Sequence, residues 1–94
     1  MQIKYSKHLK DRLSLRRMDY DLPKRIFEQS DERYVDQETG YLVATMTVEL
    51  YNKSRDVMIA YAMEEDFVKL LTIHPLKEGQ KDNRVKSGRW RKIQ

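Results

Sequence analysis

Residues 41–51 constrain the fold more than any other segment of this 94-residue chain, because apolar side chains alternate there with mostly polar ones. Such alternation is typical of an antiparallel strand that has one face on a core and the other toward water. The continuously apolar face consists of Leu42, Ala44, Met46, Val48 and Leu50. The segment therefore predicts a half-buried strand, which needs neighbouring strands and a covering layer.

Three further segments, 33–35, 57–63 and 67–74, are strand candidates because they are rich in β-branched, aromatic and other apolar residues. The stretches between the candidates are short and polar, and Gly40 in the first of them can adopt a positive φ. Connections this short favour antiparallel neighbours. Residues 33–74 are thus predicted to form a four-stranded antiparallel meander.

Two helices are predicted ahead of the sheet. A helix over residues 6–17 opens with a serine cap, and Leu9 and Leu13, four residues apart, give it an apolar stripe. A second helix over residues 21–30 has Pro23 at its first position, where the missing N–H costs nothing. Both helices are expected to cover the apolar face of the meander.

The fold class expected is α+β, with two amino-terminal helices packed on a four-stranded antiparallel sheet and a basic carboxyl-terminal tail. A chain of this length forms one domain. Its expected parts, within the single domain 1–94, are the helices in 1–30, the sheet in 33–74 and the tail in 75–94. The tail has no sustained periodicity, and we expect a helical turn near residues 82–86 and an extended segment over 89–93.

Both ends of the chain are basic and the middle is acidic. Six lysines and arginines against one aspartate give residues 1–17 a net charge of +5, and seven against two acids give residues 75–94 the same charge. Residues 18–74 carry six basic and twelve acidic side chains. If the fold brings the two ends together, they form one positive surface that attracts polyanions such as RNA. The alternative is that both ends are ordinary solvated termini.

Several classes of function are disfavoured by what the sequence lacks. There is no cysteine, no phosphate-binding glycine-rich loop, no HExxH motif and no serine on an elbow-like turn, so we expect neither a metal nor another cofactor. No apolar run approaches the roughly 20 residues that span a bilayer, and the first residues do not resemble a signal peptide. We therefore expect a cytoplasmic protein without membrane association.

The two histidines are the candidate catalytic groups. His8, Arg12 and Arg16 recur every four residues and lie beside the apolar stripe of the first predicted helix, whereas His74 ends the last predicted strand. RNA cleavage needs no metal when the 2′-OH is the nucleophile, because it needs only a base, an acid and cations around the phosphorus. These side chains could supply those groups. Equally, His8 could be a surface residue and His74 could bond a backbone carbonyl.

The tail holds basic side chains interleaved with the single tryptophan, in the order Arg84, Lys86, Arg89, Trp90 and Arg91. Arginine forks bind phosphate, and a tryptophan between them can stack on an RNA base. The alternative is that Trp90 fills the edge of the core and anchors the carboxyl terminus, which would also fix Arg89 and Arg91 in place.

Four short motifs resemble the DUF4258 family: Ser6-Lys7-His8 with Arg12, Leu22-Pro23-Lys24-Arg25-Ile26, Asp36 to Gly40, and Leu71-Thr72-Ile73-His74-Pro75. The order of elements is similar to that of BrnT, a toxin grouped with the RelE and ParE toxins. The resemblance implies a small α/β toxin fold, ribonuclease activity that stops translation and neutralisation by a cognate antitoxin. The ParE branch implies inhibition of gyrase, a protein target, instead. The strands here carry few basic residues, which moves the expected site to the first helix and the end of the chain.

The sequence thus predicts the toxin component of a type II toxin-antitoxin system, a metal-independent endoribonuclease that acts on mRNA, free or ribosome-bound. The alternatives are a non-catalytic RNA- or ribosome-binding module and a protein-binding toxin of the ParE type. The expected catalytic residues are His8, His74, Arg12 and Arg84. The expected substrate-binding residues are Arg16, Lys86, Arg89, Trp90 and Arg91. Whether the chain forms a homodimer is left open by the sequence.

Overall fold

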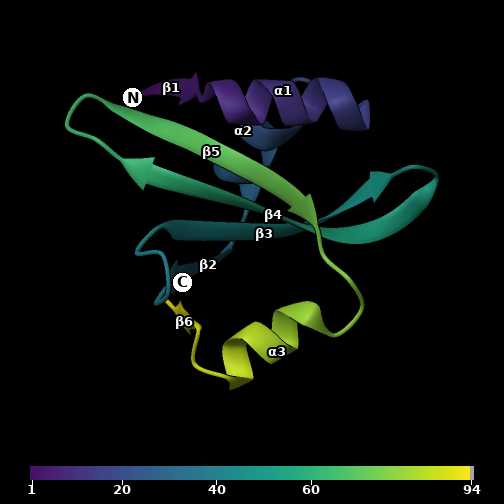
Figure 1. The fold of residues 1–94 in the computed structure, drawn as a ribbon, viewed down its shortest axis with the longest axis vertical. Coiled ribbons are helices and arrows are strands. Elements are labelled where there is room, and N and C mark those ends of the chain that lie inside the picture. Colours follow the sequence, from purple (N-terminus) through teal and green to yellow (C-terminus); the bar gives the residue numbers. More distant parts are fainter. Residues whose placement is uncertain (94) are drawn as a thin grey trace.

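A computed structural model describes residues 1–93 and has an α+β fold (Figure 1). The elements in chain order are β1 (Gln2–Tyr5), α1 (Lys7–Arg16), α2 (Leu22–Gln29), β2 (Glu32–Asp36), β3 (Leu42–Leu50), β4 (Lys53–Met63), β5 (Phe67–Pro75), α3 (Gln80–Lys86) and β6 (Trp90–Lys92). The strands form one sheet in the order β1-β5-β4-β3-β2-β6, in which β1 runs parallel to β5 and all other neighbours are antiparallel. The α+β class is as expected, but the sheet is mixed and has six strands.

Strands β2 to β5 form the predicted meander. The longest pairing joins β3 to β4, from Leu42 opposite Tyr61 to Leu50 opposite Lys53. Tyr51 and Asn52 turn the chain there, both at positive φ, as a two-residue hairpin of type I′ requires. Strand β1 was not expected, and β6 was expected only as an extended segment, because the two strands have four and three residues and are too short for alternation to stand out.

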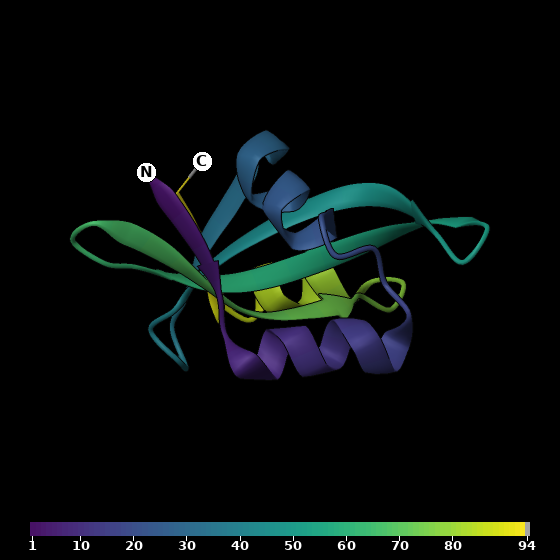
Figure 2. The same ribbon diagram turned by 90° about the horizontal axis from the view of Figure 1, so that it is seen from above.

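The first helix follows the local signals in the sequence. The Ser6 hydroxyl accepts a hydrogen bond from the Leu9 backbone N–H at 3.0 Å and donates to the Leu71 carbonyl at 2.9 Å, so it caps α1 and ties it to β5. Arg17 ends α1 in the left-handed conformation. The second helix carries Pro23 in its first turn. Helix α1 runs along the outer edge of β5, and α2 lies over the middle strands (Figures 1 and 2).

The larger core cluster lies between the two amino-terminal helices and one face of the sheet. The helices contribute Leu9, Leu13, Leu22 and Ile26, all 2 % exposed or less. The face of β3 that was predicted to be apolar contributes Ala44, Val48 and Leu50 as buried residues, with Leu42 and Met46 packed at the side. The predicted face assignment and the predicted covering helices are thus confirmed.

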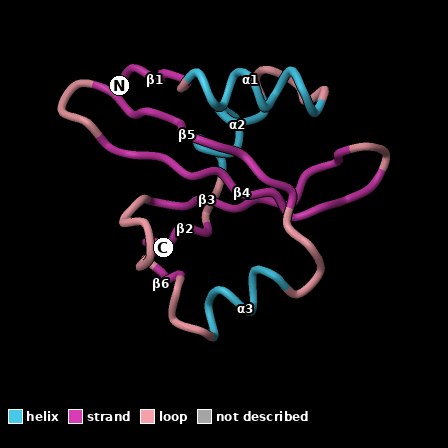
Figure 3. Tube along the Cα trace, viewed as in Figure 1, coloured by secondary structure: helices cyan, strands magenta, loops and turns pink. Residues whose placement is uncertain are grey.

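A smaller cluster lies on the other face of the sheet and consists of Tyr34, Val43, Met58, Ala60 and Trp90, with Leu76 beside it. The tail forms this cluster's cover: after β5 the chain crosses to α3 and returns as β6 beside β2 (Figure 3). The expected helical turn is therefore a helix, and the expected extended segment is a strand. No helix within residues 1–93 is long and apolar enough to cross a membrane.

Candidate nucleic-acid interface

The first and last thirds of the chain meet at a contact between Arg12 and His74. Arg12 Nη1 of α1 lies 3.2 Å from His74 Nδ1 at the end of β5. A guanidinium only donates hydrogen bonds, so Nδ1 must accept and the ring proton must reside on Nε2. His74 is thereby oriented as a neutral side chain with one N–H left to donate.

The charged groups that act on the pKa of His74 are all basic. Burial lowers the pKa of His74, and the nearby Arg12, Arg16 and His8 lower it further. Burial and Arg16 likewise lower the pKa of Arg12. Within residues 1–93 neither Arg12 nor Arg16 makes an ion pair. His74, Arg12, Arg16 and His8 thus form a site whose positive charge a bound anion would neutralise.

The row of His8, Arg12 and Arg16 on α1 lies at the border of the core, as predicted. His8 is exposed, Arg12 and Arg16 are half-buried, and together with Asp11 and Leu15 they line an open hollow of about 330 Å³. Asp11 is bonded to Lys7 at 3.0 Å and Leu15 is 84 % exposed. The hollow therefore combines an apolar edge with cations, as a surface for a nucleotide strand would.

On its other side His74 lines a cavity of about 180 Å³ between β5, α3 and β6. Its polar and aromatic lining consists of Asp36, His74, Gln80, Arg84, Arg89 and Trp90. Arg84, predicted to be catalytic, is therefore on the same cavity as His74, while Arg12 reaches His74 from α1. His74 is the residue common to both regions, and side chains from the two basic ends of the chain approach it there.

Arg89 holds the tail to the sheet. Its Nε and Nη2 each lie 3.2 Å from an oxygen of Asp36, and its Nη1 lies 3.4 Å from Glu38. Burial by itself raises the pKa of Asp36, but the hydrogen bonds from Arg89 and from the Glu38 and Thr39 backbone outweigh it, and the pKa is lowered. The same ion pair raises the pKa of Arg89. Any phosphate contact by Arg89 would therefore have to compete with two carboxylates.

Trp90 is in the core and is not a surface platform. Its side chain is 3 % exposed and its ring packs against Tyr34 at 5.5 Å between centroids. The expectation that it stacks on a base is corrected, since no ring face is open to one, and the alternative of an anchored carboxyl terminus holds. Lys86 and Arg91 are exposed, and neither lines the cavity. Alternation along β6 directs Arg91 to the face opposite Trp90.

Two polar residues of the cavity, Asp36 and Gln80, were not predicted as site residues from the sequence. Asp36 was assigned only to a turn, although its bond to the Glu38 N–H is the Asx-turn pattern that the local sequence favours. Gln80 has no local signal, because its place depends on where α3 docks. Its Oε1 accepts from the Lys77 backbone N–H at 2.9 Å.

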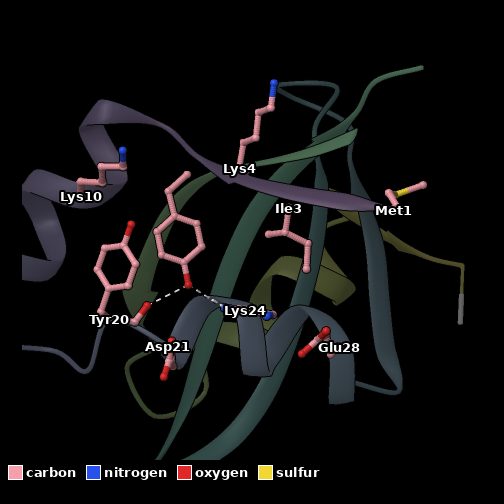
Figure 4. A pocket seen from close by; sticks show the side chains of 9 residues that line it. Met1, Ile3, Lys4, Lys10, Tyr20, Asp21, Lys24 and Glu28 are labelled. Atoms are coloured by element: carbon pink, nitrogen blue, oxygen red, sulfur yellow. Dashed lines mark hydrogen bonds between the residues drawn. The ribbon is translucent and has the colours of Figure 1, made fainter. Parts of the chain in front are cut away.

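A hollow of about 630 Å³ lies elsewhere, between β1, α2, Lys10 of α1 and the loop before α2 (Figure 4). Tyr5 lines it, and its hydroxyl is satisfied internally, since it donates to the Tyr20 carbonyl at 2.8 Å and accepts from the Lys24 N–H at 3.2 Å. None of the predicted site residues lines this hollow. Its size therefore does not make it the candidate site.

Residues 1–93 contain no group of three or more histidine, aspartate or glutamate side chains that could hold a metal ion. Compared with known proteins, the chain matches no family model, no curated protein and no solved structure.

Proposed function

We propose that the chain acts on RNA as a toxin of the RelE and BrnT type, a metal-independent endoribonuclease that a cognate antitoxin neutralises. The observation that carries this proposal is the contact of Arg12 with His74. Arg16 and His8 lie near this pair, so within residues 1–93 two histidines and two arginines come together without an acidic partner. Such a group suits a phosphodiester, because each cation gains from an anionic partner and the histidines can handle protons.

In the proposed reaction the RNA phosphate binds to Arg12 and Arg16 while the exposed His8 takes the proton of the 2′-OH. The 2′-oxygen then forms a bond to phosphorus and the bond from phosphorus to the 5′-oxygen breaks. The products are a 2′,3′-cyclic phosphate and a 5′-hydroxyl, whose proton comes from protonated His8 or from water. His74 stays neutral, since Nδ1 is held by Arg12, and its Nε2 proton is available for a hydrogen bond to a phosphate oxygen of the same RNA strand.

The test is cleavage of a single-stranded RNA by the purified chain, with the 2′,3′-cyclic product quantified. His8→Ala should lower the rate about 10²–10⁴-fold, as loss of a general base does. Arg16→Gln should weaken RNA binding and flatten its salt dependence. The matched control is Arg25→Gln, because Arg25 is an exposed arginine on α2. Growth arrest on induced expression that survives the double change of His8→Ala and His74→Ala would contradict the catalytic assignment.

A second candidate is an RNA- or ribosome-binding module without catalysis. The observation that favours it is that His74 cannot accept a proton at Nδ1 unless it leaves Arg12. This candidate expects the same loss of binding in Arg16→Gln, but no cleavage at any pH. Cleavage that disappears in His8→Ala would exclude it.

A further inference from the structure

The cavity beside His74 is lined by hydrogen-bond donors that have no partner in the protein. His74 Nδ1 accepts from Arg12, so Nε2 carries the remaining proton. Gln80 Oε1 accepts from the Lys77 N–H, so its amide nitrogen has two protons to donate. Trp90 Nε1 is buried and has no hydrogen-bond partner within residues 1–93. An unpaired buried donor is destabilising, and a ligand that accepts the hydrogen bond would remove that cost.

The one acidic residue of the cavity is already engaged by other donors. Asp36 Oδ2 accepts from Arg89, and Oδ1 accepts from Arg89 and from the backbone of Glu38 and Thr39. Arg84, by contrast, makes no ion pair within the described part of the chain. Within these residues the cavity thus presents one unpaired cation and three neutral donors, while its one carboxylate is paired with Arg89.

We propose that this cavity binds a single phosphate group, held by Arg84, Gln80, Trp90 and His74. The donors come from β5, α3 and β6 and so approach the cavity from different sides, which suits a tetrahedral oxyanion. A planar carboxylate would be satisfied by one arginine fork. The volume of about 180 Å³ is below the roughly 300–1,000 Å³ of pockets for whole small molecules, so one small group is the better fit.

The source of the phosphate rests on the proposed function. It is the phosphate of the RNA strand next to the one bound by Arg12. The site would also bind inorganic phosphate, because the recognition is of the oxyanion alone. A bound dianion would favour protonation of His74, so phosphate should raise the pKa of this histidine.

The test uses the full chain and inorganic phosphate at constant ionic strength, set with chloride. The chain has one tryptophan, so its indole N–H gives a single, unambiguous resonance in a nitrogen-proton correlation spectrum. We expect a saturable shift of this resonance and of the His74 ring. Arg84→Gln should weaken phosphate binding about 10–100-fold, the effect of one hydrogen bond to a charged group. Arg25→Gln should leave it unchanged.

Trp90→Phe tests the indole donor separately, since it keeps an aromatic ring in the core and removes only the N–H. Phosphate binding, followed at the His74 ring, should weaken in this variant. A shift that never saturates, or an equal loss in Arg84→Gln and Arg25→Gln, would overturn the proposal, because the effect would then be general screening.

A short single-stranded RNA separates the two proposals. RNA that moves the indole resonance and competes with phosphate supports both. Phosphate binding without any response to RNA supports the cavity and removes the RNA function. RNA that shifts the α1 resonances but neither moves the indole nor competes with phosphate leaves the RNA function standing and overturns the cavity as its phosphate site.

Discussion

The two faces of the sheet are covered in different ways. The face under α1 and α2 holds the larger core cluster, made mostly of aliphatic residues from two helices and three long strands. The opposite face holds a smaller cluster closed by Trp90, and α3 above it has no buried residue. Half-buried His74, buried Asp36 and the unpaired Trp90 N–H all occur near this second cluster. One face of the sheet thus supplies stability, whereas the other leaves polar groups within reach of a ligand.

The largest effect on the free energy of unfolding is expected in β4, where two neighbouring residues point to opposite faces of the sheet. Ile59→Ala empties a fully buried position in the larger cluster and should lower the free energy of unfolding by about 2–5 kcal/mol. Met58→Ala, in the smaller cluster, should cost about 2 kcal/mol or less, because fewer neighbours lose contacts. Denaturant unfolding of both variants measures the difference. Equal losses would mean that the second face is as well packed as the first.

The same contrast separates what local sequence could predict from what it could not. Alternation in residues 41–51 assigned the faces of β3, and the stripe of Leu9 and Leu13 placed α1 on the core. These signals are periodic, so a short window contains them. The pairings of Arg12 with His74 and of Asp36 with Arg89 join residues that are 62 and 53 positions apart. Such contacts depend on how whole elements dock, which no local pattern encodes.

Trp90 illustrates the limit for the candidate site. A tryptophan among arginines has the same local sequence whether it stacks on a base or closes a core. The choice is made by β6 pairing with β2, which sets Trp90 opposite Asp36 and against the Tyr34 ring. The basic character of the site was predictable, but the division of its arginines into free and paired ones was not.

A smaller effect on the free energy of unfolding is expected from the ion pair of Asp36 with Arg89, which attaches the tail to the sheet. Asp36→Asn removes the carboxylate from Arg89 and should lower the free energy of unfolding by about 1–3 kcal/mol, since the guanidinium loses two charged hydrogen bonds at a buried partner. Glu38→Gln is the matched control, because Glu38 is 68 % exposed and should contribute about 0–1 kcal/mol. Thermal unfolding at neutral pH compares them.

The ion pair also has a pH signature. The pKa of Asp36 is lowered in the folded protein, so its contribution to stability is complete above the ordinary aspartate pKa of about 3.9 and is lost as the pH falls through the folded value. The difference in stability between the wild-type chain and Asp36→Asn should therefore shrink in acid. A difference that stayed constant from neutral pH into that range would show that Asp36 acts by packing rather than by charge.

The smallest effect on the free energy of unfolding is expected from the titration of His74, and it occurs in a different pH range. Its folded pKa is lowered, so below the ordinary value of about 6.5 the unfolded chain binds a proton that the folded chain does not. Stability from this group is therefore complete above pH 6.5 and declines as the pH falls toward the folded pKa. His74→Gln should remove that part of the decline, which thermal unfolding across this range would detect.

Arg12→Gln tests whether the Arg12 contact helps to lower the pKa of His74, because it removes the adjacent positive charge while leaving the imidazole in place. The pKa of His74, followed by the proton resonances of its ring, should then rise toward the ordinary value, and the decline in stability should become shallower. Arg25→Gln makes the same change of charge on α2, and should leave the titration as it is. If both variants raise the pKa equally, the net charge of the protein governs His74, and the contact between α1 and β5 is not what keeps this histidine neutral.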